Sequence, residues 1–300
     1  MAAGQDGDTA AGFAYAVSAY LMWGFLPLYM KALSSVPAAE VVAHRVLWSV
    51  PVAGAILIVL GRTSDLKAAL MSRRMLGMAV PTAALISVNW GIYVWAIGSG
   101  HALDAALGYY INPLFSIALG TIFLRERLTR WQLAAIGLAA CAIGLVTWEA
   151  GRLPVVALAL TLSWGCYALL KKSLPIGPNQ GFMLEVLILL PLALGYLGWL
   201  WAGGGFHFGE SAQVSWLLAG TGIVTAVPLM VYANGAKLLR LSTIGILQYI
   251  APTMIFLTAV FVFGEPFSAT KAVAFGLIWV ALAVYSFELL RMSRKDKAVS

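Results

Sequence analysis

Long apolar blocks, each about long enough to cross a lipid bilayer, follow one another along almost the whole chain. Because a helix rises about 1.5 Å per residue and the hydrocarbon core is ~30 Å thick, a spanning helix needs ~20 mostly apolar residues. Only 10% of the residues are charged and 61% are hydrophobic, whereas soluble domains contain about 25% charged residues. The sequence lacks the alternating segments of about ten residues that are typical of outer-membrane barrels. The pattern predicts an all-α integral membrane protein.

The apolar blocks predict ten transmembrane helices in two sets of five. The first set covers residues 12–30, 39–60, 75–97, 102–123 and 131–148, and the second covers 153–170, 181–201, 214–236, 242–263 and 269–289. The connections are too short to hold a soluble domain. Residues 1–11 and 291–300 are predicted to be cytoplasmic tails. Residues 1–11 carry no Lys or Arg, which is unlike the start of a cleaved signal peptide.

The basic residues predict how the chain is inserted. With the N-terminus inside, fifteen Lys and Arg residues fall in the inside segments, and only Lys31, Arg152 and Lys271 fall outside. Cytoplasmic loops of membrane proteins carry such an excess of basic residues. We therefore predict a multi-pass protein of the bacterial inner (plasma) membrane with both termini in the cytoplasm. The net charge of +7 is explained by insertion, so no nucleic-acid partner is expected.

The two halves of the sequence resemble each other at an offset of about 140 residues. The matched positions run in order along all five spans and include Trp23 with Trp164, Pro51 with Pro191, Tyr93 with Tyr232, Pro113 with Pro252 and Glu126 with Glu265. A unit of five spans ends on the opposite side from where it began, so the second copy must be inverted. We predict a first five-helix repeat over 12–148 and an inverted one over 153–290. Inverted repeats are typical of secondary transporters, whose substrate site lies near the midplane between the repeats.

Two prolines stand at matching places, Pro113 in the fourth span and Pro252 in the ninth. A proline inside a helix removes one backbone hydrogen bond and strains the preceding turn. Interrupted helices at corresponding positions of two halves point to a transport site. Both prolines are therefore predicted to be hinge or kink positions beside the substrate, although kinks that serve only packing are the alternative.

Polar and aromatic residues in the middle of the spans are the candidates for substrate binding. Polar groups within a bilayer are costly unless they face the interior of the bundle. The alternative for each is simple packing. The candidates are Trp23, Asn89, Tyr93, Tyr109, Asn112, Trp164, Tyr167, Tyr232, Gln248 and Tyr249. Together they predict an amphipathic cavity suited to a zwitterion with an apolar side chain.

Charged residues inside the spans are few. Arg45 and Glu185 occupy equivalent positions of the two repeats, but about nine residues of helix separate their depths by roughly 14 Å. We therefore expect Arg45 to pair with Asp104 near the outer face, and Glu185 to pair with Lys171 or Lys172 near the inner face. Arg45, Asp104 and Glu185 are candidates for a charge relay or for structural ion pairs. Glu185 is the natural candidate if transport is coupled to protons.

Sequence motifs for enzymatic chemistry are absent. There is no phosphate-binding loop of an ATP-driven motor, no H-E-x-x-H motif and no Cys or His cluster with zinc spacing. We expect no catalytic residue, no metal and no cofactor. Cys141 and Cys166 both lie inside apolar spans, where small packing residues are the expected role.

Several segments carry a family resemblance: Pro37–Glu40, His44–Ser49, Gly108–Leu114, Arg240–Thr243 and Gln248–Pro252. They resemble RarD-type proteins of the drug/metabolite transporter (DMT) superfamily, which have two EamA-type domains per chain. The resemblance covers nearly the whole chain. It implies ten helices, inverted repeats, alternating access and export of small organic solutes. It also implies kinship with amino-acid exporters of the YddG type, and some relatives are linked by name to chloramphenicol sensitivity.

Together these observations predict an exporter of small organic metabolites, most of all neutral or aromatic amino acids, working by alternating access around a midplane cavity. Spans one, three, four, six, eight and nine are expected to line it. The alternatives are a drug or general metabolite exporter, a lipid flippase or membrane enzyme, and a structural subunit without transport. The expected partners are a small-molecule substrate and the lipid bilayer, and a monomer is compatible with the sequence, which does not fix the oligomeric state.

Overall fold

The computed structural model describes residues 9–124, 128–172, 174–236, 238–239 and 241–299. Its helices are α1 (Ala10–Ala32), α2 (Ala38–Val59), α3 (Ser64–Met71), α4 (Arg73–Gly98), α5 (Ala102–Leu124), α6 (Arg130–Ala150), α7 (Val155–Lys172), α8 (Pro178–Gly203), α9 (Ala212–Ala236), α10 (Leu241–Leu247), α11 (Ile250–Leu257) and α12 (Ala269–Val299). A π-helical turn, Thr258–Val262, continues α11. The prediction of an all-α membrane fold is confirmed.

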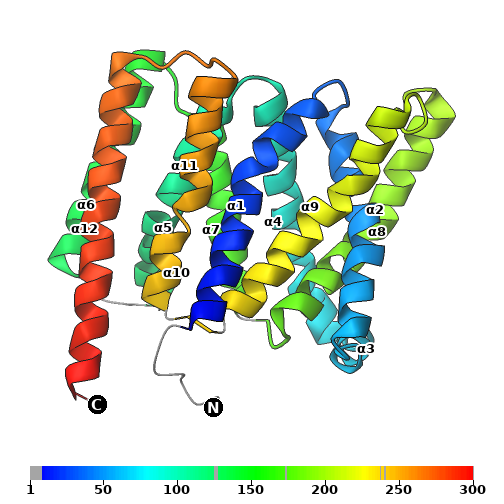
Figure 1. The fold of residues 1–300 in the computed structure, drawn as a ribbon, viewed down its shortest axis with the longest axis horizontal. Helices are drawn as coiled ribbons and strands as arrows, with labels where there is room; N and C mark the ends of the chain where they lie inside the picture. Colours follow the sequence, from blue (N-terminus) through cyan, green and yellow to red (C-terminus); the bar gives the residue numbers. More distant parts are fainter. Residues whose placement is uncertain (1–8, 125–127, 173, 237, 240, 300) are drawn as a thin grey trace.

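Each predicted span coincides with a helix or, for the ninth, with the run from α10 to the π-helical turn. Within the described residues, seven helices are long and apolar enough to cross a membrane: α1, α2, α4, α6, α8, α9 and α12. The number of ten crossings stays a prediction. The start of α1 and the end of α12 lie at the same end of the bundle (Figure 1), which we call the terminal end.

Local signals explain where several helices begin and end. The Thr9 side chain accepts a hydrogen bond from the Gly12 amide at the start of α1, which satisfies one of the free amides of the first turn. Thr129 and Gln132 form a reciprocal capping box at the start of α6. The same helix ends at Gly151, whose φ of 62° is in the left-handed region that glycine adopts without steric cost.

The packing of the helices follows the two-fold exchange of the repeats. In the first half α1, α2, α4, α5 and α6 are equivalent to α7, α8, α9, α10–α11 and α12 in the second. The contact of α1 with α9 is matched by that of α7 with α4, and the contact of α5 with α7 by that of α11 with α1. Equivalent helices also pair across the axis, with α6 and α12 at one edge of the bundle and α2 and α8 at the other (Figure 1). The contacts thus agree with the predicted repeat of five helices, and its inversion in the membrane stays a prediction.

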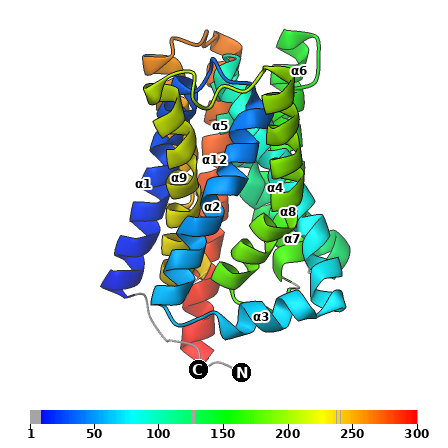
Figure 2. The same ribbon diagram turned by 90° about the vertical axis from the view of Figure 1, so that its right-hand side faces the viewer.

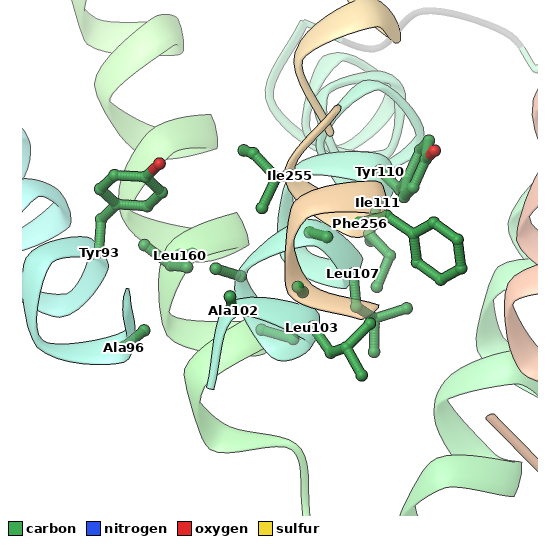
Figure 3. Packing of buried hydrophobic residues seen from close by; sticks show 14 of the residues in the cluster. Tyr93, Ala96, Ala102, Leu103, Leu107, Tyr110, Ile111, Leu160, Ile255 and Phe256 are labelled. Carbon is green, nitrogen blue, oxygen red and sulfur yellow. The ribbon is translucent and has the colours of Figure 1, made fainter. Parts of the chain in front are cut away.

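Side chains from both halves share one buried cluster. Leu107 and Ile111 of α5 lie beside Leu160 of α7 and Phe256 of α11 (Figure 3). Close approach of α5 and α7 depends on Gly108, where a Cβ atom would lie 2.7 Å from the carbonyl oxygen of Ala157. Small residues let backbones approach in this way in membrane bundles, where packing drives helix association.

Three features differ from the sequence prediction. Helix α3 was not expected, and it lies across the terminal end of the bundle (Figure 2). Helix α12 continues to Val299, through the region predicted to be a tail. The ninth span is interrupted as predicted, because α10 ends at Leu247 and α11 begins at Ile250. The fourth is not, because α5 runs without a break through Pro113, so the prediction of matching interruptions is wrong.

Candidate functional site

A cavity of about 730 Å³ lies between the two halves of the bundle. It is lined from α1, α2, α4, α5, α7 and α9 and from the interrupted segment around Gln248. Spans one, three, four, six, eight and nine, which were expected to contribute, all do so. The residues that extend the lining farthest toward the terminal end are Lys171 at the end of α7, Pro178 at the start of α8 and Ala236 at the end of α9.

Nine of the ten candidate binding residues line this cavity: Trp23, Asn89, Tyr93, Tyr109, Asn112, Trp164, Tyr167, Tyr232 and Gln248. The tenth, Tyr249, packs against the hydrophobic cluster of α5 and α11 instead. Of the two predicted hinges, Pro252 lines the cavity and Pro113 does not. The sequence therefore locates the cavity well, whereas binding of a substrate by these residues stays a prediction.

Aromatic rings form two groups in the cavity wall. Tyr20, Trp23 and Tyr232 are mutual neighbours, each pair with ring centroids 5.6 Å apart. On the other side, the rings of Trp164 and Tyr167 are also 5.6 Å apart. Such edge-on and tilted arrangements are preferred by aromatic pairs. The first group joins α1 of the first half to α9 of the second, and the second group comes from α7, whose Trp164 ring lies 6.5 Å from the Tyr109 ring of α5.

Asn89 links α4 to α7 through hydrogen bonds in the cavity wall. Its Nδ2 donates to Ser163 Oγ at 2.9 Å and to the Leu160 carbonyl at 3.2 Å, and the Tyr109 hydroxyl donates to its Oδ1 at 3.3 Å. This satisfies the donors and one acceptor position of the amide, so Asn89 has a structural role whatever it binds. Asn112 differs, because its Oδ1 is buried in the cavity wall without a hydrogen-bond partner.

Arg45 lies in the cavity wall, and it forms no ion pair with Asp104 in the part of the chain that the structure describes. Its Nε donates to Thr225 Oγ1 at 3.0 Å, and its guanidinium lies 4.7 Å from the centre of the Trp90 ring. The predicted pair is wrong because Arg45 points across the bundle toward α4 and α9. Asp104 instead lies in the first turn of α5, where the positive end of the helix dipole favours a carboxylate.

Glu185 pairs with Lys171, as predicted. The Lys171 Nζ lies 2.6 Å from Glu185 Oε1, and the Tyr167 hydroxyl donates to Oε2 at 3.3 Å. The Glu185 side chain is 1% exposed and the Lys171 side chain 19%. Lys171 lines the cavity, whereas Glu185 lies behind it. The geometry is that of a structural ion pair that orients a cavity lysine.

Polar contacts between the two halves tie together the end of the bundle opposite the termini. The buried Glu40 accepts from the His207 amide at 2.8 Å, and its other oxygen lies 2.6 Å from His207 Nδ1. Glu265 accepts from the amides of Ala102 and Leu103, at 2.7 and 2.9 Å. A carboxylate at a helix N-terminus satisfies free amides and is favoured by the dipole.

These contacts have no signal in the sequence. Glu40 belongs to a family motif, and Glu265 is the repeat partner of Glu126, which lies outside the described residues. When a glutamate follows the end of one span, the sequence does not indicate which helix of the other half it caps.

Comparison with known proteins gives consistent results. Residues 10–148 match the EamA-like transporter family. The chain is 40% identical to the uncharacterized transporter YojE of Bacillus subtilis, over 98% of this chain and 99% of the relative. It is 39% identical to protein RarD of Escherichia coli, over 96% and 98%. It is also 31% identical to the chloramphenicol-sensitive protein RarD of Pseudomonas aeruginosa, over 95% and 96%.

A solved crystal structure shares the fold, with a TM-score of 0.62 at 19% identity, covering 95% of this chain and 99% of the other. At this identity the likeness concerns the fold alone. The full-length relatives, the all-helical bundle and the cavity between its halves agree with one another. The chain therefore belongs to the RarD-type transporters of the drug/metabolite transporter superfamily, whose members contain EamA-like domains.

Proposed function

We propose that this protein exports small organic metabolites by alternating access around the cavity between its halves, and that neutral and aromatic amino acids are its substrates. The observation that carries the proposal is the cavity itself. A volume of about 730 Å³ is within the range of small-molecule sites. Its wall combines aromatic rings with a few polar groups, which suits a molecule with an apolar body and a polar end.

The two ends of the bundle differ in a way that fits one state of an alternating-access cycle. The cavity lining reaches the terminal end, whereas the opposite end is tied by Glu40 with His207 and by Glu265 with the start of α5. If the termini are cytoplasmic, as the basic residues predict, this is an inward-facing state. Substrate would then enter from the cytoplasm and leave after the ties at the outer end open.

A drug exporter is the second candidate. It is favoured by the name of one relative, the chloramphenicol-sensitive RarD protein, and the cavity volume does not separate a drug from an amino acid. The distinction needs a direct assay of solutes.

Counterflow into liposomes that contain the purified full-length protein tests the proposal. The panel consists of labelled phenylalanine, tryptophan, leucine and chloramphenicol. We expect exchange of the amino acids, reduced in Trp164→Ala because that ring lines the cavity. Trp199→Ala is the matched control, since Trp199 is 67% exposed on the outer surface of α8. Exchange of chloramphenicol alone would favour the second candidate, and a lack of exchange for every solute would refute transport of this class.

A further inference from the structure

Arg45 is a buried cation whose counter-ion is absent from the described part of the protein. The residue is 3% exposed. A guanidinium has five N–H donors. Nε donates to Thr225 Oγ1, but Nη1 has no hydrogen-bond partner among the residues that the structure describes. The Trp90 ring adds a cation–π contact with the guanidinium, which does not neutralise the charge.

Two buried carboxylates of the bundle have partners other than Arg45. Glu40 is held by His207, and Glu185 is held by Lys171. Asp104 makes no ion pair with Arg45 within the residues that the structure describes. An uncompensated charge in the interior of a membrane bundle is costly, and residues of this kind in membrane helices pair with a partner or mark a substrate path. Because Arg45 lines the cavity, a solute in the cavity is in a position to supply a counter-ion.

The surroundings of Arg45 fit a carboxylate. Arg45, Trp90, Tyr93 and Thr225 all line the cavity, and the buried Tyr93 hydroxyl also lacks a hydrogen-bond partner. A carboxylate accepts hydrogen bonds at both oxygens, and Arg presents its donors in a planar fork that matches this geometry. Thr225 fixes the orientation of the fork by accepting from Nε.

We propose that Arg45 is the anion-binding residue of the cavity and that the substrates are organic acids or amino acids. The carboxylate of the substrate pairs with the guanidinium of Arg45, and the aromatic rings of the cavity wall contact its apolar part. The proposal rests on the proposed function and narrows its substrate class. It places the carboxylate at the closed end of the cavity, with the apolar part of the substrate directed toward Trp164 and the terminal end. Thr225 is a positioning residue, since it acts through Arg45.

Ligand binding by the purified full-length protein in detergent tests this without any need for transport. The probes are 3-phenylpropionate and its neutral isostere 3-phenylpropionamide, and the readout is the ligand-induced rise in melting temperature. We expect the acid to act at a concentration about tenfold or more lower than the amide, as expected for a hydrogen bond to a charged group. Arg45→Gln should abolish this preference, and Arg45→Lys should retain part of it. Arg152→Gln, at an exposed loop, should behave as the wild type.

Thr225→Val is a second variant for the case that Arg45→Gln does not fold, because it keeps the charge of Arg45 and removes only the hydrogen bond to Nε. It should weaken the preference for the acid over the amide without removing it. Equal effects of acid and amide on the wild type, no effect of either, or a preference that survives in Arg45→Gln would overturn the proposal. A failure of the proposed function alone gives a different result, because no solute would then exchange in liposomes while the protein in detergent would still prefer the acid to the amide.

Discussion

Removing either partner of the ion pair between Lys171 and Glu185 should destabilise the protein, but by unequal amounts. The Glu185 side chain is 1% exposed and the Lys171 side chain is 19% exposed, at the cavity wall. Lys171→Met leaves the Glu185 carboxylate buried between α7 and α8, where the Tyr167 hydroxyl is its remaining hydrogen-bond donor among the described residues. Glu185→Gln leaves an ammonium that reaches the water of the cavity and keeps a polar neighbour.

The magnitude follows from this difference in exposure. Breaking a buried pair so that one charge stays unpaired costs about 3–5 kcal/mol, and Lys171→Met should approach that range. Glu185→Gln should cost about 1–2 kcal/mol, because the remaining charge is partly hydrated and a hydrogen bond to a buried group contributes about this much. The double variant Lys171→Met with Glu185→Gln removes both charges and should be more stable than Lys171→Met alone.

Unfolding of the purified protein in mixed micelles, titrated with SDS and followed by circular dichroism, measures these differences. Arg152→Gln provides a control, because Arg152 is exposed in a loop and substitutions at such surface positions change stability by about 0.5 kcal/mol or less. The reasoning is refuted if Glu185→Gln costs as much as Lys171→Met, or if the double variant is no more stable than Lys171→Met.

Three further predictions concern the frame of the cavity. Gly108→Val should lower stability by about 1–3 kcal/mol in the same titration, as overpacking does, because the larger side chain pushes α5 away from α7. Gly198→Ala should leave stability unchanged, since nothing lies within 4 Å of a Cβ atom at that position. Glu265→Ala removes the carboxylate that caps α5, an interaction that contributes about 0.5–2 kcal/mol to stability. The variant should therefore increase labelling of a cavity cysteine by an impermeant maleimide added on the side opposite the termini. Unchanged labelling would contradict a closing role for Glu265. Pro252→Ala should slow counterflow more than Pro113→Ala, because only the ninth span is interrupted, and equal rates would contradict a hinge at the interruption.

The helices could be predicted closely because hydropathy alone determines where a chain can cross a bilayer. All ten predicted spans match helical segments, whereas the inversion, which needs five crossings in each repeat, stays a prediction. Helix α3 was missed because Ser64–Met71 is short and lies in a polar connection. The interruption of the ninth span and the continuity of the fourth could not be separated, since proline inside a helix produces either a kink or a break.

The candidate site was predicted in outline because polar groups within a bundle must face its interior. What the sequence could not provide is the rotation of each helix about its axis. The direction of the Arg45 side chain depends on that rotation, and Thr225 is its partner in place of Asp104. Tyr249 was misplaced for the same reason, since its neighbour Gln248 lines the cavity and it does not.

Passage of the solute through the cavity is the central claim, and blocking the cavity tests it most directly. Ala168 lines the cavity and is exposed, so Ala168→Cys in a Cys141→Ser, Cys166→Ala background can carry a bulky maleimide. The measurement is counterflow of labelled phenylalanine in liposomes before and after modification. We predict that exchange by the modified protein falls to the level of empty liposomes, while the unmodified variant stays active. Full exchange by the modified protein would contradict a path through this cavity.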